Sequence, residues 1–487
     1  MGSRRVVHSR RTDPVANLGG MTTSLAPTAP LAVRRVPRPV PRWWREASEL
    51  LLWALLVAVT GLWSAHGGFQ ELGSLGGALT STGRLAGLVA SALILVQVLL
   101  MARVPWFEQA WGQDELARTH RLVGFTSFTL MVGHVVLIVL GYAAASPRGL
   151  WGTLVDLVVN YPGMLLAVAG TLALGMVVVT SVKKARARLR YESWHLIHLY
   201  AYLGAGLALP HQLWTGSDFT ASTTATVLWW SLYAVSLGAV LAFRIGVPVW
   251  RSLRAPLRVV DVRRDGPEVT TVTVGGPGVA RIPARAGQFF QWRFVGEDGW
   301  TRAHPYSLSA APDGHTLRFT AAHVGDGSSA LAGLRPGTRV LVEGPYGRLH
   351  EGVRSRRKVL LMGSGIGITP MRALLEELDQ DPGDVTVLHR VSAADDAVLA
   401  GELADLARTR GASYVLVDGP RIPGRVSWLP RAAQHLTDVE GLRHVVPDVA
   451  ERDVYLCGSP GWMAAARTAV LAAGAAPEQV HLERFAY

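Results

Sequence analysis

The chain has 487 residues, 49% of them hydrophobic and 17% charged, and its mean hydropathy is +0.24. This composition excludes disorder for most of the length and is too apolar for an ordinary soluble domain. A single cysteine, Cys457, excludes a disulfide framework and a metal or redox site built on paired cysteines. The formal net charge of +12 would suit a nucleic acid partner, unless the basic residues serve another purpose.

Residues 1–45 are rich in arginine and proline and show no hydrophobic period, which predicts a disordered basic arm. The next region, 46–250, contains six long apolar stretches. Each is about 19 to 24 residues long, enough at about 1.5 Å per residue to cross roughly 30 Å of hydrocarbon. The sequence therefore predicts a membrane α-helical bundle of six spans. The predicted spans are 47–65, 78–101, 120–142, 161–182, 191–213 and 224–247.

The basic residues gather at alternate ends of these spans, before the first, between the fourth and fifth, and after the sixth. The loops on the other side carry one arginine, Arg148. By the positive-inside rule, this asymmetry predicts a multi-pass protein of the cell membrane with both termini in the cytoplasm. Because the positive charge sets the topology, no nucleic acid partner is expected. The basic clusters are Arg34, Arg35, Arg38, Arg42, Arg45, Lys183, Lys184, Arg186, Arg188, Arg190, Arg251 and Arg254.

After residue 255 the pattern changes to short β-branched alternations separated by glycine and proline, which predicts a small β-barrel over 256–352. From 355 to 487 the pattern becomes strand, glycine-rich turn and helix, repeated. This order predicts an α/β domain with a parallel sheet.

Histidines inside the predicted spans are the first functional signal, because ionisable residues at membrane depth are costly. The third span carries His120 and His134, 14 residues apart, and the fifth carries His198 and His211, 13 residues apart. The two spans run in the same direction. His120 can therefore face His198 near the cytoplasm, and His134 can face His211 near the outer side. Two such pairs fit two stacked b-type haems, each iron taking two imidazoles.

Other interpretations of these residues stay open. A lone histidine at a helix end is more often interfacial or hydrogen-bonded than a ligand, and His195 competes with His198 as the inner ligand. Thirteen residues turn an ideal helix by about 140°, and a kink at Pro210 would restore the direction of His211. Arg84, near the outer end of the second span, can snorkel outwards, neutralise propionates of the outer haem or attract an anionic acceptor.

Two motifs in the barrel region suit a flavin. In the segment 304–309, Tyr306 can cover an isoalloxazine face and the Ser307 hydroxyl can bond the ring. The segment 325–329 begins a helix, where small residues with free N–H groups suit a pyrophosphate. An ordinary loop capped by glycine and serine is the alternative for this second segment.

The α/β region carries a dinucleotide signal. The turn 363–370 lies between a strand and a helix, where glycines let the backbone approach a phosphate. Cys457 ends a later strand and can lie beside a nicotinamide ring, or be a small buried residue. Arg390 can bind a ribose 2′-phosphate, which favours NADPH over NADH, or lie on the surface. The predicted NAD(P) contacts are Gly363, Gly365, Ile366, Gly367, Ile368, Thr369, Pro370, Arg390, Cys457, Gly458 and Met463.

On these motifs the C-terminal half resembles the ferredoxin–NADP reductase superfamily, and the whole chain resembles the ferric reductase/NADPH oxidase family of transmembrane flavocytochromes. The resemblance covers roughly residues 80–487. It implies that His120, His134, His198 and His211 are the haem ligands. It also implies FAD contacts at Arg302, His304, Pro305, Tyr306, Ser307, Ser309, Gly327, Ser328, Ser329 and Phe485.

Three departures from the family pattern qualify the resemblance. His304 holds a position that is arginine in soluble members, so Arg302 is expected to take over some of the pyrophosphate contact. The aromatic residue that stacks on the flavin is often terminal in the family, so Tyr487 competes with Phe485. Oxidases carry a further histidine one turn after the outer ligand, and here that position is Ile138, which puts that kind of oxygen chemistry in doubt.

The resemblance implies an NAD(P)H-dependent oxidoreductase with FAD and two haem b groups, and with Phe485 and Cys457 in catalytic positions. Electrons would pass from cytosolic NADPH or NADH to a small acceptor outside, either molecular oxygen or a ferric chelate. One alternative is a membrane-anchored flavin reductase without haem that serves quinone or a soluble partner. Another is a nucleotide-regulated proton or solute carrier with intramembrane histidines as relay sites.

Overall fold

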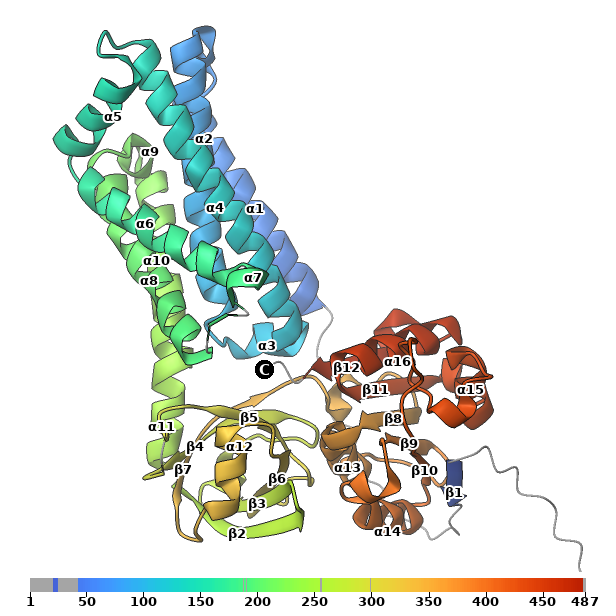
Figure 1. The fold of residues 1–487 in the computed structure, drawn as a ribbon. Helices are drawn as coiled ribbons and strands as arrows, with labels where there is room; N and C mark the ends of the chain where they lie inside the picture. The colour runs from blue at the N-terminus through green and yellow to red at the C-terminus, as the bar shows by residue number, and fades with distance from the viewer. Residues whose placement is uncertain are drawn as a thin grey trace, which may run out of the picture. The chain divides into compact units, whose positions relative to one another are not determined.

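The computed structural model describes residues 21–24, 43–186, 188–189, 191–254, 256–297 and 299–484. These divide into two compact units, one of Pro41–Trp250 and one of Met1–Val40 with Arg251–Tyr487. We call them the helical unit and the C-terminal unit (Figure 1).

The helical unit is built from long apolar helices. Five helices are long and apolar enough to cross a membrane: Trp43–Ala65, Leu75–Leu100, Glu115–Ala144, Met164–Ser181 and Thr223–Arg254. The prediction of long apolar helices is confirmed for these five. The remaining predicted span, 191–213, is a helix of 24 residues, Tyr191–Trp214. This helix is not among those five, so the sixth span remains a prediction.

The helices pack as two pairs, α2 along α4 and α6 along α8 (Figure 1). Helix α10 continues through a π-helical segment, η2, into α11. A short helix, α5, occupies part of the region that the sequence predicts as an outer loop, 143–160. The bounds are α1 Trp43–Ala65, η1 Gln70–Gly73, α2 Leu75–Leu100, α3 Pro105–Trp111, α4 Gln113–Ala144, α5 Gly149–Asn160, α6 Met164–Ser181, α7 Lys183–Arg186, α8 Tyr191–Trp214, α9 Ser217–Thr220, α10 Thr223–Ala239, η2 Val240–Gly246 and α11 Val247–Arg254.

Serine side chains begin two of these helices. Ser74 accepts a hydrogen bond from the Gly77 N–H at 3.1 Å, and Ser222 accepts one from the Ala225 N–H at 3.2 Å. Each bond satisfies an N–H group that the first helical turn leaves without a partner. Between the helices, one end of the core of the unit is aromatic, because Phe219 stacks on Trp229 with ring centroids 4.1 Å apart.

The first part of the C-terminal unit is a six-stranded antiparallel sheet in the order β5-β4-β7-β2-β3-β6. Phe290, Trp292 and Phe319 pack in its core. The expected β region is confirmed as this sheet, whereas its closure into a barrel remains a prediction. The bounds are β2 Leu257–Gly266, β3 Val269–Gly275, β4 Phe289–Val295, β5 His304–Ser307, β6 Thr316–Ala322 and β7 Arg339–Tyr346, and the short helix α12 spans Asp326–Ser329.

The second part is the expected α/β domain, with the sheet order β1-β10-β9-β8-β11-β12. Strands β8 to β12 pair in parallel, and β1 adds antiparallel to β10 at the edge. Part of the arm predicted to be disordered is therefore a strand, β1 Met21–Ser24. The other bounds are β8 Lys358–Ser364, α13 Ile368–Glu377, β9 Val385–Arg390, α14 Ala400–Arg410, β10 Ser413–Val417, α15 Asp438–Val445, β11 Arg452–Gly458, α16 Pro460–Ala472 and β12 Val480–Arg484.

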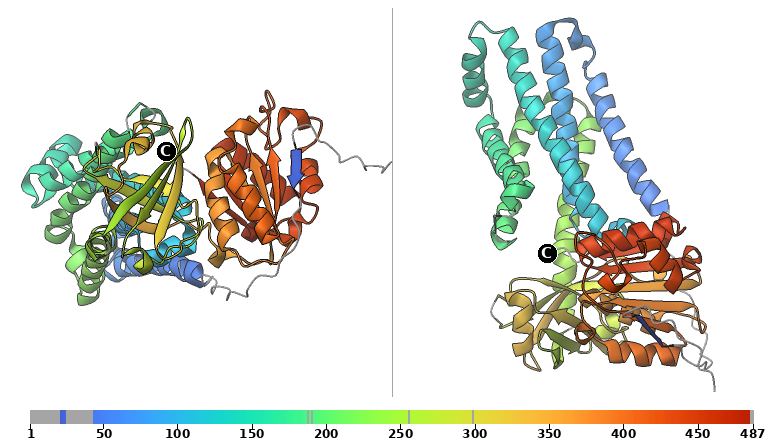
Figure 2. Two further views of the ribbon diagram at one scale, coloured as in Figure 1. Left: turned by 90° about the horizontal axis from the view of Figure 1, so that it is seen from below. Right: turned by 45° about the vertical axis from the view of Figure 1, so that its right-hand side comes forward.

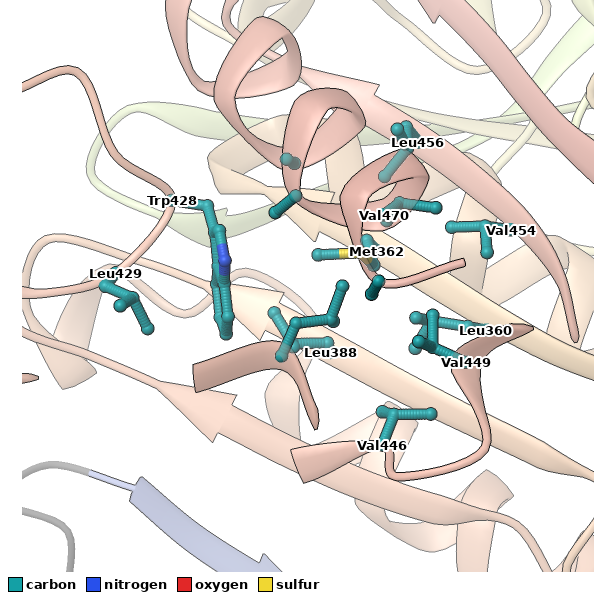
Figure 3. Packing of buried hydrophobic residues seen from close by; sticks show 14 of the residues in the cluster. Leu360, Met362, Leu388, Trp428, Leu429, Val446, Val449, Val454, Leu456 and Val470 are labelled. Carbon is teal, nitrogen blue, oxygen red and sulfur yellow. The ribbon is translucent and has the colours of Figure 1, made fainter. Parts of the chain in front are cut away.

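Helices cover both faces of this parallel sheet (Figure 2). On the face covered by α16, Leu360, Met362 and Leu456 pack with Trp428 and Val470 (Figure 3). The opposite face packs against α13 and α14. The chain runs from β8 outward to β9 and β10, and then returns to β11 on the other side of β8. The carboxyl ends of β8 and β11 thus form the switch point where sheets of this kind bind ligands.

Candidate functional site

The inner histidine pair joins α4 to α8. The ring centroids of His120 and His198 lie 5.9 Å apart. Two imidazoles on opposite sides of one metal ion, each with a bond of about 2 Å, place their centroids about 6 Å apart. The spacing therefore suits an iron held between these two rings, and it favours His198 over His195 as the partner of His120. Trp194 lies beside His198, with ring centroids 4.9 Å apart.

Hydrogen bonds fix which nitrogen of each candidate ligand is free. The Nδ1–H of His120 donates to the Gln97 carbonyl at 3.1 Å, and that of His134 donates to the Gly83 carbonyl at 2.8 Å. His211 donates from Nδ1 to the Ala208 carbonyl at 2.5 Å. The Nδ1 atom of His198 lies 3.3 Å from Ser181 Oγ. A histidine held through Nδ1 leaves Nε2 free for a metal, which is the arrangement that a haem ligand requires.

The outer pair, His134 and His211, is seated against glycines. A Cβ atom added at Gly87 would lie 2.6 Å from His134 Nδ1, and one added at Gly163 would lie 2.8 Å from the His211 backbone nitrogen. Only a residue without a side chain permits these approaches. His211 also lies close enough to His134 to interact with it electrostatically.

Arg84 has protein partners in the structure. Its guanidinium donates to both carboxylate oxygens of Asp218, at 2.8 Å each, and to Glu71 at 2.5 Å. The side chain is 18% exposed. Arg84 is therefore neutralised by carboxylates from η1 and α9, a partnership that the sequence analysis missed because Asp218 lies 134 residues away.

In the antiparallel sheet the two predicted flavin segments come together. A Cβ atom at Gly327 would lie 2.2 Å from the His304 ring, so α12 packs directly on β5. Tyr306 stacks on Phe319 with ring centroids 4.9 Å apart. The Ser307 hydroxyl is buried and has no hydrogen-bond partner among the residues that the structure describes. A buried hydroxyl in that state is suited to a polar group of a bound ligand.

Three other predicted flavin contacts differ in accessibility. Ser309 is fully buried and accepts a hydrogen bond from Thr320 at 2.8 Å, which makes it part of the core. Arg302 and Pro305 are exposed beside the same strand. Burial, together with the positive charges of Arg302 and Arg293, lowers the pKa of His304. His304 is therefore neutral at neutral pH, and Arg302 is the residue of this pair that can offer charge to a pyrophosphate.

The two predicted serine contacts lie in α12. Ser328 bonds within its own turn, where its hydroxyl accepts from the Val324 N–H at 2.9 Å, and Ser329 ends α12.

A cavity of about 640 Å³ lies at the carboxyl ends of β8 and β11, at the switch point. Of the residues predicted to contact NAD(P), Gly365, Ile366, Gly367, Arg390 and Gly458 line it. The others lie behind this lining. Gly363 and Cys457 are paired in β8 and β11, and Ile368, Thr369, Pro370 and Met463 are buried in α13 and α16.

Arg390 is turned toward backbone groups. It is 4% exposed and donates to the carbonyls of Trp428 and Gly419. Burial, with the nearby charge of Arg421, lowers the pKa of its guanidinium. Arg421 lines the same cavity and is exposed. The loop 420–425 after β10, which carries Arg421 and Arg425, could have been noted in the sequence as a second basic segment at a strand end.

The aromatic candidates at the chain end, Phe485 and Tyr487, lie outside the described residues. In the part of the chain that the structure describes, no group of three or more histidine, cysteine, aspartate or glutamate side chains could hold a metal ion.

Comparison with known proteins agrees with this division of the chain. Residues 86–209 match the family described as ferric reductase like transmembrane component. This range includes three of the four paired histidines and ends just before His211. The chain is also 27% identical over 248 residues to an NADPH oxidoreductase of Mycobacterium tuberculosis, covering 49% of this chain and 62% of that protein. The chain has a ferric reductase-like transmembrane architecture. About half of the chain is similar to a flavohemoprotein and to a ferredoxin reductase component.

Further relatives of this ferric reductase-like chain include a flavohemoprotein of Chromobacterium violaceum, 28% identical over 254 residues, covering 48% of the chain and 61% of that protein. The chain thus spans about three fifths of the length of the curated relatives it matches. Among solved structures, the FAD/NAD-binding domain of a nitric oxide dioxygenase from Vibrio cholerae is 24% identical, with a TM-score of 0.39, covering 47% of the chain and 98% of that domain.

Proposed function

We propose that this chain is an oxidoreductase that passes electrons across a membrane, from NAD(P)H to a small acceptor on the opposite side, by way of FAD and two haem b groups. The match to a ferric reductase-like transmembrane component and the reductase type of the other half support this function. The observation that carries it is the arrangement of the histidine pairs on α4 and α8, with Nδ1 held and Nε2 free.

The chain's own residues fit two haem groups. His120 and His198 would hold the inner iron, and His134 and His211 the outer one. Because Gly87 and Gly163 have no side chains, His134 and His211 can pack closely against them. The two positions on α4 are 14 residues apart, which separates the pairs by about 21 Å along the helix axis.

The antiparallel sheet fits FAD. Tyr306 would cover one face of the flavin, and the unpartnered Ser307 hydroxyl would bond the ring. Arg302 and the turn around Gly327 would meet the pyrophosphate. Phe485 would stack on the flavin until the nicotinamide displaces it.

The cavity at the switch point fits NAD(P)H. Gly365, Ile366 and Gly367 line it and would offer backbone N–H groups to the phosphates, and Cys457, one residue before the end of β11, would lie near the nicotinamide. When bound, FAD would take a hydride from NAD(P)H and release single electrons that the haems can carry. The protein's part is to hold each group in place and to exclude water around it.

The experiment is to purify the chain in detergent and reduce it with NADPH without oxygen, recording the haem b and flavin spectra. We expect both chromophores, with two haems per chain. His134→Ala and His211→Ala should each remove one haem and leave flavin reduction intact. Binding of two haems by either variant would contradict the ligand assignment.

Two other results would favour the alternatives. A yellow protein with flavin and no haem would indicate a membrane-anchored flavin reductase. Transport without oxidation of NAD(P)H would indicate a carrier regulated by the nucleotide.

NADPH is favoured over NADH by the charge around the cavity. Arg421 and Arg425 are exposed cations on its lining, and Arg425 is already paired with Asp438 at 2.7 Å. A 2′-phosphate distinguishes the two nucleotides and would meet Arg421. We expect Arg421→Ala to lower kcat/KM for NADPH about tenfold, which is about 1.4 kcal/mol, and to leave NADH within about twofold. Arg467→Ala, on α16 and away from the cavity, is the matched control. An equal loss with both nucleotides in Arg421→Ala would assign this residue a different role.

A further inference from the structure

A cluster of charged and titratable side chains lies in the helical unit beside the outer histidines. Asp218 of α9 stands between Arg84 and His66, with His66 Nδ1 3.6 Å from Asp218 Oδ1. Arg84 bonds Glu71 as well. We call these four residues, His66, Glu71, Arg84 and Asp218, the outer polar cluster.

The outer polar cluster has one more negative charge than positive. Asp218 and Glu71 face the single guanidinium of Arg84, and one proton on His66 would balance the sum. The His66 Nδ1 atom is buried and, within the described part of the chain, makes no hydrogen bond. A proton on this nitrogen would therefore meet the Asp218 carboxylate directly.

The turn that carries His66 is held in place. Gly67 has φ +86°, and a Cβ atom at Gly68 would lie 2.3 Å from the Trp63 ring, so both positions require glycine. The indole of Trp63 donates to the Ser81 carbonyl at 3.0 Å, and the Ser81 hydroxyl donates to the Gly68 carbonyl at 2.7 Å. His66 is thus positioned by the packing of α1 on α2.

The cluster connects the outer histidine site to the surface. His134 donates to the carbonyl of Gly83, and the next residue along α2 is Arg84. The exposed fraction of the side chain increases from 7% for Asp218 to 16% for His66 and 40% for Glu71. Tyr142 of α4 is a further titratable group that faces the cluster, because it interacts electrostatically with Arg84 and Glu71.

We propose that the outer polar cluster donates protons to the acceptor as it is reduced, with His66 as the donor, Asp218 as its positioning residue and Arg84 holding Asp218. This inference rests on the proposed function. The acceptor is then of the class that takes protons with electrons, such as a quinone: one quinone, two electrons from the outer haem site and two protons from His66 give one quinol. His66, whose side chain is 16% exposed, recovers each proton from water on the outer side.

The test compares two acceptors with the full chain in lipid nanodiscs and NADPH as donor. A short-chain water-soluble quinone needs two electrons and two protons, whereas ferricyanide takes one electron and no proton. We expect His66→Ala to slow quinone reduction at least about tenfold, as for loss of a general acid, and to leave ferricyanide reduction within about twofold. Added imidazole should restore the quinone rate in His66→Ala.

Asp218→Asn should also slow quinone reduction, whereas Asp156→Asn, which removes another carboxylate paired with an arginine, at 2.7 Å, should not. Thermal unfolding and haem content of each variant report whether it folds, independently of activity. If His66→Ala reduced quinone at the wild-type rate, or lost both acceptors equally without rescue by imidazole, the inference would be wrong while the proposed function stood. If the wild-type chain reduced neither acceptor, both would be wrong.

Discussion

Single atoms decide much of the chemistry that this chain can support. At the outer histidine site, the distance between α2 and α4 is set by the absence of a side chain at Gly87. At the nucleotide site, Gly367 approaches the Cys457 carbonyl so closely that an added Cβ would lie 2.4 Å from it. In both places a single methyl group would have to displace backbone or a candidate ligand.

Gly87→Ala should therefore disturb the outer haem site. The added methyl would push His134 away from its position, so we expect one haem per chain in place of two, measured by the haem b spectrum. Gly133→Ala is the matched control, because Gly133 precedes His134 on the same helix and an added Cβ meets nothing within 4 Å. Equal haem content in both variants would show that His134 is not held as the structure indicates.

Gly367→Ala should weaken nucleotide binding and lower stability by about 1–3 kcal/mol, as overpacking does. The methyl group would separate the turn after β8 from β11, the two strands that flank the cavity. The measurements are the KM for NADPH and the thermal unfolding midpoint. Gly401→Ala in α14 has open space around its Cβ and should change neither.

Elements are joined by polar contacts as well as by apolar packing. Glu402 of α14 pairs with Arg263 and Arg318 of the antiparallel sheet, at 2.9 Å each, and with Arg372 of α13 at 3.2 Å. These bonds link the sheet expected to bind flavin to the α/β domain within one unit. They therefore contribute to the orientation in which a nicotinamide would meet the flavin.

Glu402→Gln should loosen this link. Each of the three arginines would lose one ion-pair partner, although Arg263 keeps Asp265 and Arg372 keeps Glu376. We expect the free energy of unfolding to fall by about 1–3 kcal/mol, because the side chains are partly exposed. The rate of flavin reduction by NADPH, measured by stopped flow, should fall by a larger factor than the affinity for NADPH. The variant Asp405→Asn, one turn away and paired with Arg408 at 2.8 Å, should behave as wild type.

A buried histidine makes the α/β domain sensitive to acid. His389 in β9 is fully buried, and burial lowers its pKa from 6.5 to about 4. Between these values the unfolded chain binds a proton that the folded chain does not. The contribution of His389 to the free energy of unfolding is therefore fully present above pH 6.5 and is lost as the pH falls toward 4. The loss from this residue is at most about 3 kcal/mol. Thermal unfolding of His389→Gln between these pH values should show a weaker pH dependence, and an unchanged slope would contradict the assignment.

At the scale of the whole molecule, the distribution of basic residues predicts which ends of the helices face the cytoplasm. The single cysteine offers a direct test, because Cys457 is fully buried and should not react with a membrane-impermeant maleimide. Cysteine placed at the exposed Thr220, between α8 and α10, should react in intact cells. Cysteine at the exposed Lys184 should react only after the membrane is permeabilised. The reverse pattern would invert the topology.

The sequence by itself determined the elements and the order of the two parts. Apolar runs long enough to cross a bilayer, and the alternation of strand, turn and helix after residue 355, are local patterns that need no knowledge of distant contacts. The positions of the paired histidines on two helices are likewise a matter of spacing along the chain. The sixth predicted span shows the limit of this approach, because α8 forms a helix over the predicted residues but is not among the helices apolar enough to cross a membrane.

Tertiary structure alone decided which side chains meet. Asp218 neutralises Arg84 across 134 residues, and Arg390 is buried on backbone carbonyls while Arg421 lines the cavity. The approach of Gly327 to His304 likewise joins two segments that the sequence treats separately. Hydropathy and motif spacing describe one segment at a time, whereas charge pairing and cavity lining depend on how close distant segments pack.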